Sequence, residues 1–260
     1  MRRGVPRKVI FVVLKSFTNA MKFAIIADIH GNLEAFQTIL EDARSQNPTH
    51  YVCLGDIVGY NANPRECLKI VRDMNMPCVK GNHDEYCSTD DHLEGFNPAA
   101  AAAVHWTRAQ LNEEEKQWLR DLKYTKMVAN FTIVHATLDV PQRWGYVFDK
   151  LAAAASFPYQ NTQICFFGHT HVPVAFMRDT AVRGGTYSKF KVDPSKKYFV
   201  NVGAVGQPRD NNPRAAYVIY DMDAGTIELR RLEYDIPTTQ RKILAAGLPE
   251  RLAERLEYGR

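Results

Sequence analysis

Cysteine is scarce in this sequence, and the spacing patterns that cysteines form in many small domains are missing. The chain has 260 residues and 5 cysteines, an odd number, with no pair in CxxC spacing. This argues against a disulfide framework and against a zinc–thiolate site. Several cysteines fall inside apolar runs, so we expect reduced, buried thiols in a cytoplasmic protein. The five are Cys53, Cys67, Cys78, Cys87 and Cys165.

Long apolar runs and dense basic stretches are also missing. No run approaches the ~18 residues that a membrane-spanning helix needs, so we expect no membrane association. The formal charge is +4, but Lys and Arg are scattered along the chain. A nucleic acid is therefore not expected as a specific partner, whereas a small anionic substrate is. The hydrophobic fraction of 45% suffices for one ordinary core, and a homo-oligomer is left open.

The first twenty residues stand apart from the rest. Basic residues precede a short apolar run over Val9–Leu14, which is too short for the core of a signal peptide and has no clear cleavage site after it. We predict an N-terminal extension over residues 1–20 that is not part of the core. A working domain over residues 21–236 and a C-terminal helical tail over 237–260 complete the predicted organisation.

From residue 21 onward, apolar strand-like runs alternate with helical stretches. Strand-like runs at Phe23–Ala27, Tyr51–Leu54 and Pro77–Lys80 are each followed by a polar turn. Asn63 and Pro64 open a helix, with Glu66 placed for a capping box. Three strand–loop–helix units in succession predict a parallel or mostly parallel sheet.

The predicted secondary structure changes twice in the remainder of the chain. The sequence pattern over residues 85–123 predicts a helical, cap-like insertion, with helix starts at Asn97 and Asn112. After residue 130 strands dominate, and Asp223–Gly225 predicts a hairpin turn. The predicted elements are strands at Phe131–His135, Ile164–Phe167, Val174–Met177, Tyr198–Val202, Ala216–Asp221 and Thr226–Leu232, then a helical pair within Thr238–Glu257 broken at residues 247–249.

Polar residues fall where five of these strand-like runs end. They form the groups Asp28-x-His30, Gly55-Asp56, Gly81-Asn82-His83-Asp84, His135 and Gly168-His169-Thr170-His171. In a mostly parallel sheet the carboxyl ends of the strands lie at one edge, where open α/β sheets bind ligands. Residues far apart in the sequence are therefore predicted to converge on one pocket.

The donor atoms in these groups suit divalent metals. Two Asp, one Asn and four His supply oxygen and nitrogen ligands without a thiolate, which favours Mn, Fe, Co, Ni or Zn over Ca. Seven ligands exceed the four of a structural zinc, but they suffice for two ions if one carboxylate bridges. The seven are Asp28, His30, Asp56, Asn82, His135, His169 and His171.

In their order and spacing, these motifs resemble those of the calcineurin-like metallophosphoesterases, over about Met21–Tyr234. The resemblance is to the compact bacterial and archaeal phosphodiesterase-like branch. Ile57-Val58-Gly59 after Asp56, and Asp84 after His83, depart from the pattern of the phosphoprotein phosphatases. The resemblance implies a four-layer αββα sandwich of two mixed sheets, the metallophosphoesterase fold.

The resemblance also implies a role for each position. Asp28, His30 and His171 would hold one metal, while Asn82, His135 and His169 would hold the other. Asp56 would bridge the two ions. His83 would stay off the metals, stabilise the transition state at the substrate phosphate and protonate the leaving group. Asp84 would orient His83.

The implied activity is hydrolysis of a phosphomonoester or phosphodiester bond. Two cations roughly 3.5–4 Å apart would activate a bridging hydroxide that attacks phosphorus. Two other interpretations stay open. A non-catalytic scaffold of the same fold would have lost the catalytic histidine, which is present here as His83. A nuclease-type enzyme would show a clustered basic groove and a large cap.

Several neighbouring residues have two interpretations each. In the glycine-rich loop Asn201–Asp210, Arg209 either meets phosphate or pairs with Asp210 or another acid. Tyr60 and Asn61 either line the pocket or form a turn. Trp144 and Tyr146 either stack on a substrate base or pack internally. His50, His92 and His105 are expected at the surface.

Overall fold

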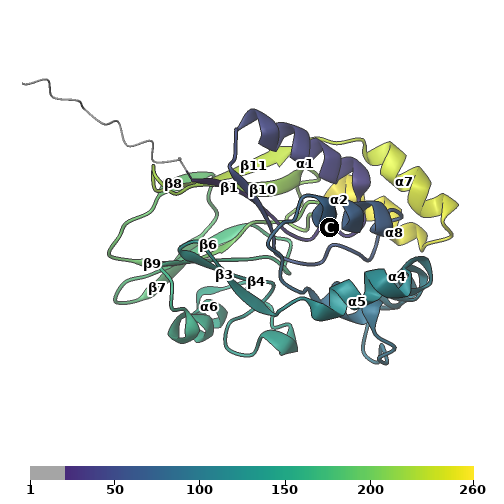
Figure 1. The fold of residues 1–260 in the computed structure, drawn as a ribbon, viewed down its shortest axis with the longest axis horizontal. Coiled ribbons are helices and arrows are strands. Elements are labelled where there is room, and N and C mark those ends of the chain that lie inside the picture. The colour runs from purple at the N-terminus through teal and green to yellow at the C-terminus, as the bar shows by residue number, and fades with distance from the viewer. Residues whose placement is uncertain (1–20) are drawn as a thin grey trace, which may run out of the picture.

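The computed structural model describes residues 21–260, so the predicted extension over residues 1–20 lies outside the described residues. Two mixed β-sheets face each other, with helices on their outer sides (Figure 1). The first sheet has the strand order β2-β1-β10-β11-β8 and the second β3-β4-β5-β9-β6-β7. The first contains β1 (Lys22–Ile26), β2 (His50–Cys53), β8 (Lys189–Lys191), β10 (Ala215–Asp221) and β11 (Thr226–Leu232). The second contains β3 (Thr125–Val128), β4 (Phe131–Val134), β5 (Ile164–Phe167), β6 (Val174–Arg178), β7 (Val182–Gly185) and β9 (Lys197–Asn201).

The helices surround this pair of sheets. Helices α1 and α2 pack on the first sheet, α6 packs on the second, and α4, α7 and α8 gather at one end of the molecule (Figure 1). They are α1 (Leu33–Ser45), α2 (Pro64–Asp73), α3 (Asn82–Ser88), α4 (Pro98–Gln110), α5 (Glu113–Asp121), α6 (Lys150–Ser156), α7 (Ile236–Ala245) and α8 (Glu250–Glu254). The expected four-layer αββα sandwich is confirmed.

The alternation of side chains along β1 explains the layering. Phe23 and Ile25 point to the second sheet, into a core shared with Phe131 and Phe166. Ala24 and Ile26 point the other way, against α1. Each aromatic ring buried in this way contributes about 1.5–3 kcal/mol relative to an exposed one. Because both faces of β1 are buried, its sequence is a continuous apolar run.

The strand directions place several carboxyl ends at a common edge. β1 runs parallel to β2, and β4, β5 and β9 run parallel to one another. The polar groups predicted from the sequence follow β1, β2, β4 and β5 directly. The predicted hairpin is also present, with β10 and β11 antiparallel and in register.

Some local predictions were wrong. The run Pro77–Lys80 does not form a full strand, because it contributes a single parallel bridge between Cys78 and Cys53. The side chain of Asn63 does not cap the backbone of α2, since its amide donates to the Glu66 carboxylate instead, at 3.0 Å. Strands β3, β7 and β8 and helix α6 were not foreseen.

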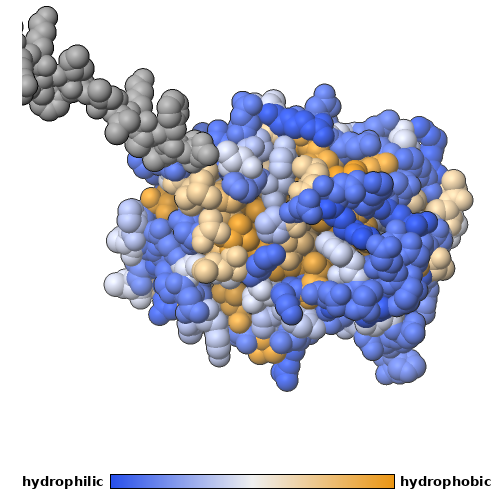
Figure 2. All heavy atoms as spheres, in the orientation of Figure 1, coloured by the Kyte–Doolittle hydropathy of each residue, from blue (hydrophilic) through white to orange (hydrophobic). Residues whose placement is uncertain are grey.

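The C-terminal helices pack against the predicted cap-like insertion. Ile243, Leu252 and Leu256 share a buried cluster with Ala100 and Ala103 of α4. Hydrophilic residues cover much of this helical end, whereas apolar residues reach the surface in patches over the sheets (Figure 2). Between residues 21 and 260, none of the helices has the length and apolar character required to cross a bilayer.

Candidate metal centre

The seven predicted ligands meet in one buried place. All but Asn82 offer a buried carboxylate or imidazole group, and these groups fall into two clusters. Within each cluster the ligand atoms all lie within 4.8 Å of one another. The first cluster contains Asp28, His30, Asp56 and His171, and the second contains Asp56, His135 and His169. Asp56 is the member that both clusters share. The predicted convergence of distant motifs is therefore observed.

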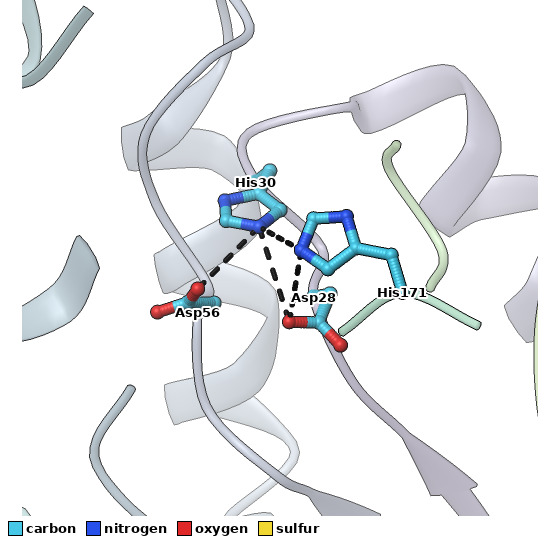
Figure 3. Close-up of side chains that lie close together, drawn as sticks. All are labelled: Asp28, His30, Asp56 and His171. Atoms are coloured by element: carbon cyan, nitrogen blue, oxygen red, sulfur yellow. Dashed lines mark hydrogen bonds and ion pairs between the residues drawn. The ribbon is translucent and has the colours of Figure 1, made fainter. Parts of the chain in front are cut away.

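The first cluster is compact. The Nε2 atoms of His30 and His171 lie 3.1 Å apart, and both rings point toward the carboxylates (Figure 3). His171 Nε2 lies 3.3 Å from Asp28 Oδ1. His30 Nε2 lies 3.5 Å from Asp56 Oδ2. Two imidazole nitrogens and two carboxylate oxygens thus face a common centre, as ligands of one divalent cation do.

The second cluster shares the Asp56 carboxylate. His135 Nε2 lies 3.3 Å from Asp56 Oδ2 and 3.2 Å from the side-chain oxygen of Asn82. The ring of His169 lies 5.1 Å from that of His135, centroid to centroid. Four buried histidines around two carboxylates would be a costly arrangement without a cation. The donor set therefore fits two divalent ions with Asp56 between them.

Main-chain carbonyls fix the orientation of the histidine rings. The Nδ1 atoms of His30, His135 and His171 lie 3.0, 2.8 and 2.6 Å from the carbonyl oxygens of Val58, Leu54 and Gln207. In each ring an Nδ1–H that donates to the carbonyl leaves Nε2 unprotonated and directed into the cluster. His169 is reversed, because its Nε2 lies 2.9 Å from the carbonyl oxygen of Trp144.

The backbone carries strain at these positions. Asp28, His30, Asp56, His169 and His171 all have positive φ, between 49° and 67°. Non-glycine residues adopt this left-handed conformation uncommonly, and such residues cluster at functional sites. Asp and His tolerate it better than most residues, which agrees with the residue types found here. The tight loops turn each side chain back over the end of its own strand.

The electrostatics of the cluster are compatible with metal binding. Burial lowers the pKa of His30 and His171 well below the usual range, and lowers that of His169 to about 3. These rings are therefore neutral at pH 7, as metal ligands must be. Burial also acts to lower the pKa of His135, but the Asp56 and Asp28 carboxylates and the Leu54 carbonyl together raise that pKa to about 10.

His83 lies beside the clusters with a free ring nitrogen. Its side chain is buried, and its ring centroid is 4.3 Å from that of Tyr60 and 4.9 Å from that of His30. Within the described residues its Nδ1 has no hydrogen-bond partner. Burial lowers its pKa to about 4, although the Asp56 carboxylate opposes the shift. Gly59 makes room for the ring, because a Cβ there would lie 2.6 Å from His83 Nδ1.

Asp84 does not orient His83 through a hydrogen bond, contrary to the role that the resemblance implied. Its Oδ2 accepts the backbone N–H groups of Asp56 and Gly81 at 2.8 and 3.0 Å. Its Oδ1 accepts the N–H of Ile57 at 2.9 Å. Oδ1 also accepts a longer bond from the N–H of Val58 at 3.4 Å, so backbone amides use the acceptor capacity of both oxygens. Asp84 instead holds the loop that carries Asp56.

The predicted substrate contacts separate into two kinds. Asn61 is 1% exposed and its amide donates to the carbonyl oxygen of His30 at 2.8 Å, so it supports the loop that carries His30. Tyr60 packs on His30 and His83 at the wall of the site. Arg209 lies over the Tyr60 ring, with 5.6 Å from Cζ to the centroid. The alternative pairing of Arg209 with Asp210 was wrong, since Asp210 pairs with Arg231.

Aromatic residues line the side of the site near His169. The Tyr146 ring stacks on the His169 imidazole with centroids 4.4 Å apart, and it is 54% exposed. Trp144 lies against His135 and Tyr124. Trp144 thus packs internally, whereas Tyr146 presents an open face. The three histidines expected at the surface, His50, His92 and His105, are exposed.

Comparison with known proteins agrees with the site. The sequence profile of the calcineurin-like phosphoesterase superfamily domain matches residues 21–225. The chain therefore belongs to the calcineurin-like phosphoesterase superfamily. A crystal structure of a metallophosphoesterase from Sphaerobacter thermophilus superposes with a TM-score of 0.83 at 40% identity, covering 93% of this chain and all of that one.

Two relatives match the chain over most of its length. It is 37% identical over 247 residues to the uncharacterized protein MJ0912 of Methanocaldococcus jannaschii, covering 91% of this chain and 98% of that protein. It is 26% identical over 212 residues to phosphodiesterase YfcE of Escherichia coli, covering 78% and 89%. The predicted likeness to compact bacterial and archaeal phosphodiesterases is confirmed.

Proposed function

We propose that this chain hydrolyses phosphate esters of small molecules, as phosphomonoesters or phosphodiesters, at a centre of two divalent metal ions. The observation that carries the proposal is the position of Asp56, whose carboxylate belongs to both buried ligand clusters. A single shared carboxylate between two sets of histidines is what a dinuclear site requires. A named phosphodiesterase among the relatives supports the diester reaction.

The proposed ligand sets follow the two clusters. Asp28, His30 and His171 would hold one ion, Asn82, His135 and His169 the other, and Asp56 both. The donors suit Mn, Fe, Co, Ni or Zn. When bound, the ions would polarise phosphate oxygens and lower the pKa of a water molecule toward neutrality.

The chain's own residues supply the remaining chemistry. His83 lies beside the ligand clusters with an unpartnered Nδ1, so it can meet a phosphate oxygen or the leaving oxygen. Buried donors that are held in advance stabilise developing charge more strongly than donors in water. Because burial lowers the pKa of His83 to about 4, the negative charge of a bound phosphate would have to raise that pKa before His83 transfers a proton to the leaving oxygen as a general acid. Arg209 is near enough to Tyr60 to assist in binding the anion.

The test is hydrolysis of bis-p-nitrophenyl phosphate and p-nitrophenyl phosphate by protein that was stripped with a chelator. Activity should be absent after stripping and return with Mn²⁺, Co²⁺, Ni²⁺, Zn²⁺ or Fe²⁺ supplied singly. Metal analysis should give two ions for each active chain. Failure of all five metals to restore turnover of either ester would reject the enzyme and favour a non-catalytic scaffold of the same fold.

A further inference from the structure

A cavity of about 480 Å³ lies next to the proposed metal centre. It is bounded by Tyr60 from the loop after β2, Arg209 from the loop after β9, and Arg255 directly after α8. Asn97 and Ala99 place the N-terminal end of α4 at the same cavity. Segments far apart in sequence therefore enclose one space, and the C-terminal helices form part of its wall.

Within residues 21–260, no Asp or Glu side chain pairs with Arg209 or Arg255, which both line this cavity. Over residues 21–260, the arginine ion pairs belong to Arg65, Arg72, Arg120, Arg183, Arg230 and Arg231. Arg209 donates to the side-chain oxygen of Gln207 at 2.8 Å, and Arg255 donates to the main-chain oxygen of Arg260. Both guanidinium groups are partly buried and retain unused donors.

Positive charge accumulates around the cavity. Arg251 and Arg260 also line it, and Glu254 is the one acidic residue among its lining residues. Burial and the neighbouring Arg209 lower the pKa of Arg255 to about 10. Charges of one sign repel each other in a partly desolvated space, so an anion bound among them would be stabilised. The amino-terminal end of α4 adds a favourable partial charge.

Tyr60 connects this cavity to the reaction centre. Its ring centroid lies 4.3 Å from that of His83 and 5.6 Å from Arg209 Cζ. A substrate that places one phosphate beside His83 would therefore extend past Tyr60 toward the arginines. Arginine is suited to the far end, since its planar fork binds phosphate oxygens in pairs.

We propose that Arg209 and Arg255 form a second anion-binding subsite, which holds a non-scissile phosphate while another phosphate is hydrolysed at the metal centre. The substrate class is a phosphate ester that carries a second phosphate group, such as a nucleoside bisphosphate ester. This inference rests on the proposed hydrolase function for the identity of the first phosphate, but the subsite can be tested by binding alone.

The binding test compares thymidine 3′,5′-bisphosphate with thymidine 5′-monophosphate by calorimetry on the full, Mn²⁺-loaded chain. The second phosphate should tighten binding by on the order of tenfold, as charge-assisted hydrogen bonds do. Arg255→Ala and Arg209→Ala should each lose most of this preference, and Arg255→Lys should keep part of it. Arg241→Ala is the matched control, because this exposed arginine of α7 bonds to Thr238 outside the cavity.

The kinetic test compares thymidine 5′-(p-nitrophenyl phosphate) with its 3′-phosphorylated form. The two esters share a leaving group, so their ratio of kcat/KM isolates the second phosphate. The ratio of the 3′-phosphorylated ester to the other should exceed one in the natural chain and in Arg241→Ala. It should fall toward one in Arg255→Ala, because the KM of the 3′-phosphorylated ester rises. Thermal unfolding of each variant establishes that it is folded.

The outcomes separate this inference from the proposed function. Turnover of both esters with equal kcat/KM, and equal affinity for the two nucleotides, would overturn the subsite while the hydrolase stands. A preference that survives Arg255→Ala and Arg209→Ala unchanged would also overturn it. Tight, arginine-dependent bisphosphate binding without turnover of either ester would support the subsite and reject the hydrolase.

Discussion

The carboxylate of Asp84 accepts the backbone N–H of Asp56 at 2.8 Å, so one acid fixes the position of the other. The same carboxylate accepts the N–H groups of Gly81 and Ile57. Asp84→Asn would turn one acceptor into a donor facing buried amides, at a cost of about 2–4 kcal/mol in the free energy of unfolding. Urea unfolding measures this loss of stability, and Mn²⁺ titration measures the accompanying loss of metal affinity. Unchanged stability together with unchanged metal affinity would contradict this role.

His83→Ala should retain the metals and lose rate. Proton transfer by a positioned side chain contributes roughly 10²–10⁴-fold, so kcat should fall within that range. The loss should be larger for a methyl ester than for a p-nitrophenyl ester, because the poorer leaving group depends more on protonation. His105→Ala, which removes an exposed histidine, is the control. Equal losses for both leaving groups would remove His83 from the acid role.

Gly59→Ala should reproduce much of the His83→Ala defect, because Gly59 is far from His83 in the sequence but lies against its ring in the fold. Gly59 has φ of +91°, and an added Cβ would lie 2.6 Å from His83 Nδ1. The methyl group would therefore displace the imidazole and strain the turn. We expect kcat to fall by at least about tenfold with two metals still bound, as metal analysis and steady-state kinetics would show. A fully active Gly59→Ala enzyme would mean that the ring position is not required.

Asp56→Asn should weaken both metal ions together. Its carboxylate lies 3.5 Å from His30 Nε2 and 3.3 Å from His135 Nε2, one ring from each proposed ligand set. An amide offers one neutral oxygen in place of a shared charge, so both affinities should fall by about tenfold or more. Stepwise chelation followed by metal analysis separates the two sites. Retention of one ion at full affinity would show that Asp56 does not bridge.

A partly buried ion pair away from the metal centre makes stability depend on pH. Arg230 donates to both carboxylate oxygens of Asp42 at 2.6 and 2.8 Å, and Tyr217 donates to the same group. The Arg230 hydrogen bonds lower the pKa of Asp42 in the folded protein. Its contribution is therefore present above the unfolded pKa near 3.8 and lost as pH falls through the lower folded value.

Asp42→Asn should accordingly cost about 1–2 kcal/mol at pH 7, and the difference from the natural chain should shrink below about pH 4. Urea unfolding at pH 7 and pH 3 measures it. Asp73→Asn serves as control, because its pair with Lys69 is exposed and worth little. A difference that stays constant with pH would show that the charge of Asp42 does not matter.

The metal centre could be predicted from the sequence because its parts are short-range patterns. Asp28, Asp56, His135 and His169 each follow an apolar run that forms a strand buried on both faces, and parallel strands bring their ends together. The edge strands could not be predicted in the same way. β3 and β7 are mostly exposed, so their sequences lack the apolar signal that marks a strand.

Other features depend on tertiary contacts that no local pattern reveals. Arg209 and Arg255 are 46 positions apart, so the sequence did not indicate that the fold places both at one cavity. The function of Asp84 was also missed, because hydrogen bonds to backbone amides leave no trace in residue type. Gln207 contributes only its carbonyl oxygen to His171, which any residue at that position could supply.

The carbonyl tethers on three of the histidines mean that the polypeptide itself sets the orientation of these rings. Val58, Leu54 and Gln207 hold His30, His135 and His171 through main-chain atoms, which side-chain substitutions leave in place. The affinity of a site with nitrogen and oxygen donors generally rises from manganese to copper and is lower again for zinc, so metal supply decides much of what is bound. The metals found in a purified sample should therefore follow the supply in the growth medium, with copper and zinc displacing manganese wherever they are plentiful.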